Sequence, residues 1–236
     1  MNSNILIFFT IFLVMLFGIW MGSFIRKIIY CVLDKKRTIS LSLIIHIVCG
    51  KINETTNRFQ VAKYKYCVLI NVFLYLAIFY IHGFSLESVI YSLFTSSLIT
   101  ITVVDWYIYE IPREVNLFIL ILGGFRILFD FKNYQTYLLG FFSVSIFLTI
   151  IYILTKGRVI GGGDIKLMAV SGLLLGVYPV SLAFFLGLVL AASIHIIRMI
   201  FFGAEKILAL GPYLSIGLLL SILFGENIII FYLSYF

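Results

Sequence analysis

The chain has 236 residues, of which 63% are hydrophobic and 11% are charged. An average soluble domain is about 45–50% apolar and about 25% charged, and a fold of this size could not bury so much extra apolar surface in water. The composition therefore excludes a soluble globular enzyme, a disordered chain and a disulfide-stapled secreted module. The sequence predicts an all-α polytopic integral membrane protein.

The first apolar run covers residues 5–24 and is long enough to cross roughly 30 Å of hydrocarbon. No basic residue precedes it and a basic cluster follows it, so we expect a retained helix whose N-terminus lies outside, and not a signal peptide. The run at 38–49 is too short to span and fits an interfacial or re-entrant segment. Residues 226–236 fit either an interfacial stretch or an extension of the last helix. Seven further spans are expected, at about 67–82, 87–106, 115–130, 136–155, 166–178, 180–200 and 207–224.

Basic residues gather between the first two expected spans. Nine of the 17 Lys and Arg residues lie from Arg26 to Lys65. In the eight-span topology this stretch faces the cytoplasm, in agreement with the positive-inside rule. We expect one membrane domain over residues 1–236, with a basic cytoplasmic loop at 26–66 that faces anionic lipid. Aromatic stacking residues do not alternate with these basic side chains, so a nucleic acid partner is not expected.

The three cysteines, Cys31, Cys49 and Cys67, form no Cys-x-x-Cys pair. The three histidines share no spacing typical of metal ligands. Because the basic loop is expected in the reducing cytoplasm, we predict free thiols, without a disulfide or a metal site.

Two of the ten acidic residues stand apart from the rest. Asp105 ends a run that has carried no charge since Glu87, so it enters the end of an expected span from the apolar side. Asp164 directly precedes the expected span 166–178. In the eight-span topology both lie at the cytoplasmic face, where the two carboxylates can meet. The other eight acids fit solvated helix ends and loops, whereas acids inside a bilayer are costly and usually functional.

A pair of aspartates suits the hydrolysis of a peptide bond. Two carboxylates at close range share a proton, because both do not ionise easily together. The ionised one can take a proton from water while its protonated partner polarises the carbonyl and later protonates the leaving nitrogen. This chemistry needs neither a metal nor a nucleophilic side chain. The pair predicts a hydrolytic site.

Three successive glycines, Gly161, Gly162 and Gly163, precede Asp164. Glycine permits unusual backbone conformations and the close approach of another chain, so this loop can admit an extended substrate beside the acid. The alternative is a plain flexible connector, with Asp164 as the N-cap of the following helix. A second glycine pattern, Gly172 and Gly176, is expected to hold the span at 166–178 against the span at 87–106.

Four motifs, in order, resemble those of the type 4 prepilin peptidases, a family of membrane aspartyl proteases. The most specific is IGGGDIKLMA at 160–169, which is similar to the family's Gly-x-Gly-Asp-x-Lys block. The others are MGSFIRKIIY at 21–30, VDWYIYEIP at 104–112 and ALGPYLSIG at 209–217. The resemblance covers most of the chain, from Gly22 to Gly217.

The resemblance implies a GxGD-type aspartyl protease architecture with Asp105 and Asp164 as the catalytic pair. Gly161, Gly162, Gly163 and Lys166 would belong to the active-site loop. The implied reaction is removal of the short basic leader from type 4 prepilin or pseudopilin precursors, at the cytoplasmic face of the bacterial inner membrane. Precursor proteins and membrane lipid are the implied partners.

The chain departs from the family pattern in two places. Larger members carry two Cys-x-x-Cys pairs in the cytoplasmic loop, and this chain has none, so no metal is expected there. Arg26 stands where the first family motif usually has Asn. Many members also methylate the new N-terminus with S-adenosylmethionine, but nothing in the sequence identifies a site for that cofactor. Proteolysis is expected to need no cofactor.

Three other functions remain open from the sequence. A related glycine-aspartate protease, such as a preflagellin peptidase or a signal-peptide peptidase, would use the same pair of acids. A small transporter can also bury acids, although internal repeats would then be typical. A catalytically silent membrane scaffold is the third, and the intact pair of acids weighs against it.

Overall fold

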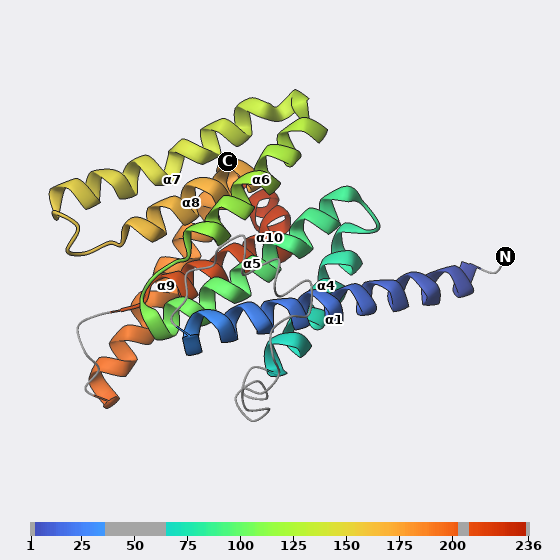
Figure 1. Ribbon diagram of the computed structural model, residues 1–236. Helices are drawn as coiled ribbons and strands as arrows, with labels where there is room; N and C mark the ends of the chain where they lie inside the picture. Colours follow the sequence, from blue (N-terminus) through green and yellow to red (C-terminus); the bar gives the residue numbers. More distant parts are fainter. Residues whose placement is uncertain (1–2, 36–64, 203–207, 235–236) are drawn as a thin grey trace. The chain divides into compact units, whose positions relative to one another are not determined.

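The computed structural model describes residues 3–35, 65–202 and 208–234. These form two compact units, Met1–Thr100 and Ile101–Phe236, which are described separately. Across the described residues the structure contains eight α-helices, one short 3-10 helix and no strand (Figure 1). This confirms the predicted all-α fold of a polytopic membrane protein.

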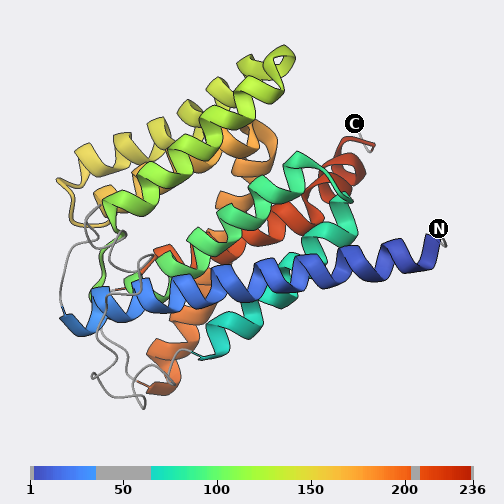
Figure 2. The ribbon, with the colours of Figure 1, turned by 45° about the vertical axis from the view of Figure 1, so that its right-hand side comes forward.

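The first unit contains α1 (Ser3–Lys35), α4 (Lys65–His82) and most of α5 (Leu86–Ile108). Helix α1 packs against α4 (Figure 2). Two glycines one turn apart make this approach close, because a Cβ on Gly18 or Gly22 would lie 3.1 Å or 2.9 Å from a Cα atom of α4. Small residues at such spacing let membrane helices approach each other.

A buried polar cluster joins the three helices of this unit. The Asn71 side chain donates to the Gly18 carbonyl of α1 at 3.0 Å. Its own oxygen accepts from the Ser96 hydroxyl of α5 at 2.9 Å, and that hydroxyl also lies 2.8 Å from the Tyr75 hydroxyl. Buried polar groups are usually paired in this way, because an unpaired one costs stability.

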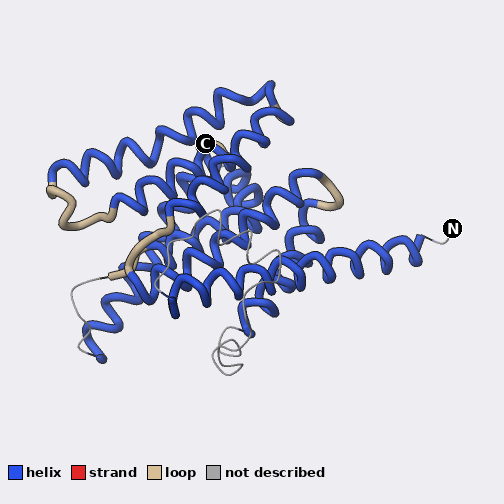
Figure 3. Tube along the Cα trace, viewed as in Figure 1, coloured by secondary structure: helices blue, strands red, loops and turns tan. Residues whose placement is uncertain are grey.

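The second unit contains the end of α5 from Ile101 onward and the remaining helices. Short loops join most of them (Figure 3), and the 3-10 helix Phe131–Asn133 precedes α7. The helices are α6 (Arg113–Phe129), α7 (Tyr134–Leu154), α8 (Gly162–Leu175), α9 (Val177–Phe202) and α10 (Gly211–Leu233).

Helix α8 lies between two neighbours in this unit. It packs antiparallel to α7 through Gly172, where an added Cβ would overlap the carbonyl of Gly140. It runs parallel to α6, because Ile111 lies against Gly163 and Gly123 lies against Leu173. The expectation that the glycine pattern holds α8 against α5 was therefore wrong for Gly172. Close helix packing at a glycine is a local property, whereas the choice of partner depends on the whole fold.

Helices α9 and α10 form an antiparallel pair. A Cβ on Gly187 would lie 3.1 Å from the Cα of Leu214, and a Cβ on Gly217 would overlap the carbonyl oxygen of Ala183 in α9. Farther along, the Ser221 hydroxyl donates to the Pro179 carbonyl at 2.7 Å. These contacts fix the start of α10.

The eight described helices correspond to the eight expected spans. Five are long and apolar enough to cross a membrane, namely those that include Phe9–Ile29, Leu86–Ile108, Phe131–Leu154, Val177–Phe201 and Gly211–Tyr232. Helix α8, with 14 residues, is the shortest; at 1.5 Å per residue it measures about 21 Å, less than the hydrocarbon thickness. Eight crossings therefore stay a prediction.

Two boundaries differ from the expected ones. Helix α1 continues to Lys35, so the first part of the expected loop at 26–66 is helical. The rest of that loop up to residue 64, including the expected interfacial segment at 38–49, lies outside the described residues. Helix α10 continues to Leu233, so the segment that follows Glu226 extends the last helix as far as the structure describes it.

Candidate active site

Asp105 lies near the end of α5 and is buried, with 5% of its surface exposed. Its carboxylate oxygen Oδ2 accepts the main-chain N–H of Gly211 at 3.0 Å. Gly211 is the first residue of α10, where unpaired N–H groups and the helix dipole favour a negative charge. The carboxylate is therefore held at a helix N-terminus that belongs to a distant part of the sequence.

Helix α5 ends shortly after Asp105. The N–H of Tyr109 donates to the Asp105 carbonyl at 2.9 Å, and Tyr109 itself has a φ of 59°. This left-handed conformation is uncommon for a residue other than glycine, and such strained backbone often lies next to functional groups. It turns the chain sharply into the loop that leads to α6.

Asp164 lies in the first turn of α8, with 8% of its surface exposed. The N-cap of α8 is Gly161, so Asp164 is the third residue of the helix and not its cap. Its carboxylate accepts a backbone hydrogen bond from Gly161. The interpretation of Asp164 as an ordinary N-cap was therefore wrong.

The two carboxylates are close enough for the charge of one to act on the other. Asp164 precedes the expected span 166–178, and its helix is not among those long enough to cross a membrane. The pKa of Asp164 is raised to about 7, first by burial and second by the negative charge of Asp105. A pair of this kind shares a proton near neutral pH. The structure therefore brings together the two acids that the sequence singled out.

The three glycines before Asp164 differ in their surroundings. A Cβ on Gly163 would lie 3.2 Å from the Cβ of Ile111, so the absence of a side chain lets the loop after α5 approach the start of α8. A Cβ on Gly161 would lie 3.0 Å from the Asp164 carboxylate, whereas one on Gly162 would meet open space. Gly161 and Gly162 are exposed. The loop is therefore packed on one side and accessible on the other.

Lys166 is exposed and lies two residues beyond Asp164 on α8. Residues two apart on a helix do not face each other, so Lys166 and Asp164 point to different sides. Its assignment to the active-site loop stays a prediction.

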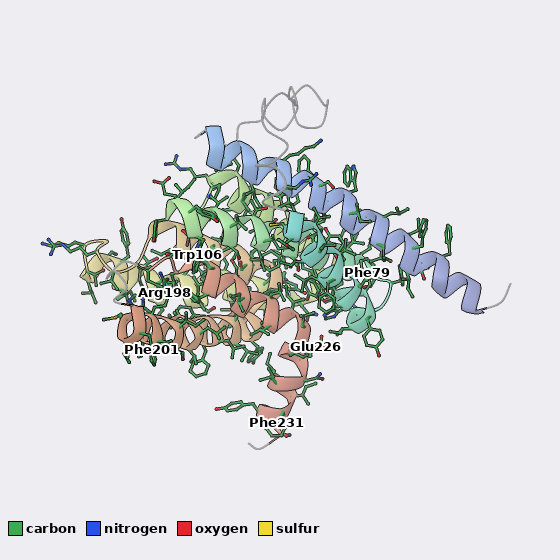
Figure 4. The ribbon with its side chains drawn as sticks, turned by 90° about the horizontal axis from the view of Figure 1, so that it is seen from below. Phe79, Trp106, Arg198, Phe201, Glu226 and Phe231 are labelled. Atoms are coloured by element: carbon green, nitrogen blue, oxygen red, sulfur yellow. The ribbon has the colours of Figure 1, made fainter. Side chains whose placement is uncertain are left out.

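Sequence reasoning did not assign roles to three residues beside the pair. Gly211 belongs to the motif ALGPYLSIG at 209–217 and Ile111 to the motif VDWYIYEIP at 104–112, but neither motif revealed its contact. Trp106 lies beside Arg198 of α9 (Figure 4), whose guanidinium is 5.5 Å from the ring centroid. This cation–π contact ties the end of α5 to α9 directly after Asp105.

Within residues 3–35, 65–202 and 208–234, no three His, Cys, Asp or Glu side chains gather into a group that could hold a metal ion.

Residues 92–196 match the model of the Type IV leader peptidase family, a segment that contains both aspartates. The prepilin leader peptidase/N-methyltransferase of Bacillus subtilis (strain 168) is 34% identical over 158 residues, which cover 64% of this chain and 62% of that relative. The chain thus matches less than two thirds of the relative's length. No solved structure shows significant similarity to the chain. The match to the Type IV leader peptidase family over residues 92–196 therefore supports the resemblance of the two motifs that contain Asp105 and Asp164.

Proposed function

We propose that the chain is a membrane aspartyl endopeptidase that removes the short basic leader from type 4 prepilin or pseudopilin-like precursors. The observation that carries this proposal is the pair of buried carboxylates, Asp105 and Asp164, which come from different helices and interact electrostatically. Buried acids with a specific charged neighbour are typical of catalytic sites. The family match supplies the class of substrate.

The reaction balances with one proton on the pair. A water oxygen bonds to the scissile carbonyl carbon while one of its protons passes to the ionised aspartate. The protonated aspartate gives its proton to the carbonyl oxygen, so a neutral tetrahedral intermediate forms. The C–N bond then breaks as the nitrogen takes the first proton, and a hydroxyl proton of the intermediate returns to the other aspartate. The pair ends with the one proton with which it began.

The loop before Asp164 provides the access that an extended substrate needs. Gly161 and Gly162 are exposed, and Gly162 has open space where a side chain would project. We assign these two glycines to the substrate side of the loop and Gly163 to its packed side, against Ile111. Lys166 is exposed and lies two residues after Asp164 on α8, so we assign it to contact with the precursor or with a lipid headgroup.

The proposed site lies at the cytoplasmic face of a bacterial inner membrane, with the N-terminus outside. The distribution of basic residues supports this orientation, because nearly all of them fall on one side of the eight-span topology. A precursor with a basic leader and a hydrophobic helix would then present its scissile bond at the same face. Cleavage of such a precursor requires no contact with nucleic acid.

The test is cleavage of a co-expressed prepilin-like precursor in membranes, with the product identified by mass spectrometry. The wild-type chain is expected to release the leader at one bond. Asp105→Asn and Asp164→Asn keep the size of each side chain but remove the acid, and both are expected to leave the precursor intact at equal protein levels. Unchanged cleavage by both variants would contradict the mechanism. A wild-type chain that cuts none of several such precursors would favour a transporter or a scaffold instead.

The same product answers whether the chain also methylates the new N-terminus. The printed name of the Bacillus subtilis relative includes an N-methyltransferase, and that activity would use S-adenosylmethionine. No described residue is assigned to this cofactor, and no step of the proposed proteolysis uses it. A product heavier by one methyl group, dependent on added S-adenosylmethionine, would establish the second activity.

A further inference from the structure

The amide of Gly211 is a polar partner that a helix distant in sequence supplies to the proposed pair. Its N–H donates to Oδ2 of Asp105 at 3.0 Å, across 106 residues of sequence. The first N–H groups of an α-helix have no acceptor within the helix. In α10, Pro212 has no N–H, and the N–H of Tyr213 donates to the Leu210 carbonyl. Asp105 is thus the acceptor for the first free donor of this helix.

This contact distinguishes the two oxygens of Asp105. A main-chain amide can only donate, so Oδ2 must present a lone pair to it. Because a carbonyl oxygen accepts a hydrogen bond better than a carboxyl hydroxyl does, this contact favours placing a proton held by Asp105 on Oδ1. The hydrogen bond also restrains rotation of the carboxylate, and such restraint matters because small displacements of a catalytic group are costly.

The absence of a side chain at position 211 makes the contact possible. A Cβ on Gly211 would lie 2.7 Å from Oδ2 and 3.0 Å from the carboxyl carbon of Asp105. Any other residue would push the carboxylate away from the amide that holds it. The donor itself is fixed, because α10 packs closely on α9 at Gly187 and Gly217.

We propose that Gly211 is a positioning residue that holds Oδ2 of Asp105 and leaves Oδ1 as the oxygen that accepts the proton of the attacking water. Asp105 is then the base of the pair, and Asp164 is the acid that carries the shared proton. This inference rests on the proposed peptidase function and assigns the roles of base and acid within that reaction.

The test compares three variants of the full chain in membranes, with a prepilin-like precursor as the substrate. In Gly211→Ala the added methyl displaces the Asp105 carboxylate, so kcat is expected to fall about 100-fold while KM stays within about twofold. Gly124→Ala is the matched control, because a Cβ there meets nothing within 4 Å, and it should behave as wild type. Pro212→Ala loosens the same helix start without placing an atom on Asp105, and its kcat should stay within about threefold of wild type.

A second replacement removes the hydrogen bond without adding an atom. Glycolic acid at position 211, incorporated by nonsense suppression, exchanges the N–H for an ester oxygen. We expect kcat to fall about tenfold or more, as when one preorganised donor is removed from an active site. This variant decides the question if Gly211→Ala fails to accumulate.

The outcomes distinguish a failure of the positioning role of Gly211 from a failure of the proposed peptidase function. If wild type cleaves the precursor and both Gly211 replacements keep its kcat, the positioning role is wrong and the peptidase proposal stands. If Pro212→Ala loses as much as Gly211→Ala, or KM carries the whole loss, the effect is structural and the inference is also wrong. If wild type does not cleave, the proposed function itself fails.

Discussion

Each unit of the molecule buries polar side chains, but the two do so differently. In the first unit, Asn71, Tyr75 and Ser96 are neutral and hydrogen-bond with one another. In the second, Asp105 and Asp164 are acids that act on each other through charge and accept hydrogen bonds from backbone groups. The first arrangement satisfies its members internally, whereas the second leaves carboxylate oxygens available for chemistry.

The difference separates a structural polar cluster from a reactive one. Neutral groups that satisfy each other rigidify a core and cost little to bury. Paired carboxylates in a poorly solvated site repel each other when both are ionised, so they oppose folding unless one holds a proton. Catalytic groups are often kept at such a cost in stability. The polar cluster of the first unit should therefore affect stability and the acid pair should affect rate.

The largest effect on the cleavage rate is expected when either acid of the pair is replaced. Asp105→Asn and Asp164→Asn should each lower the cleavage rate about 10³-fold or more, because a general acid or base is lost. The melting temperature in detergent should stay equal to that of wild type or rise, because a buried charge is removed. Thermal unfolding and single-turnover cleavage of the same preparations measure both quantities. A large drop in melting temperature would show that these acids hold the fold together.

The second effect concerns pH. The pKa of Asp164 is raised to about 7, so this residue is mostly protonated below that pH and mostly ionised above it. If Asp164 supplies the proton to the substrate, single-turnover rates should fall about tenfold per pH unit above that pKa. A rate that stays constant from neutral pH to pH 9 would contradict the role of Asp164 as the acid. Wild-type protein that remains folded over the same range is the control.

The third effect concerns the loop beside Asp164. Gly163→Ala places a methyl group 3.2 Å from the Cβ of Ile111, so the start of α8 should shift by a few tenths of an ångström. We expect a loss of rate of about tenfold, because small displacements of catalytic groups are costly. Gly124→Ala, where a Cβ meets nothing within 4 Å and which lies outside the loop, is the matched control. Adding Ile111→Ala to Gly163→Ala should restore part of the rate, and no recovery would show that the contact is not the cause.

The smallest effect on rate is expected in the first unit. Asn71→Ala removes the side chain that accepts from the Ser96 hydroxyl and donates to the Gly18 carbonyl in wild type. The free energy of unfolding should fall by about 1–3 kcal/mol, the usual cost of unsatisfied buried groups. The cleavage rate per folded molecule should stay within about twofold of wild type. Gln135→Ala, at an exposed position, provides the control. A loss of cleavage rate in Asn71→Ala, without a matching loss of stability, would contradict the assignment of this cluster to stability alone.

Much of the helix layout could be predicted from the sequence. Apolar runs identify membrane helices locally, and the eight expected spans each correspond to a described helix. Asp105 and Asp164 were also identifiable, because an acid at the end of an apolar run is unusual and costly. Helix α1 is longer than predicted because Arg and Lys are good helix formers, so a charge that ends a span does not end the helix.

The contacts around the acids could not be predicted in the same way. The Gly211 amide lies 106 residues from Asp105 in sequence, and a Gly-Pro motif does not say which group its helix will meet. The packing partner of Gly172 could not be predicted for the same reason. The spacing of Gly172 and Gly176 predicted close packing, but Gly172 packs against Gly140 of α7 and not against a residue of α5. Both contacts depend on how distant helices are arranged, which local hydrophobicity does not encode.

The central claim is that Asp105 and Asp164 act as one unit. A double-mutant cycle of Asp105→Asn, Asp164→Asn and the double variant tests it directly, with single-turnover cleavage of a prepilin-like precursor as the measurement. If the two acids share one reaction, the double variant should be no slower than the slower single variant, within about threefold. If the double variant instead loses the product of the two single effects, the acids work independently and the shared-proton mechanism is wrong.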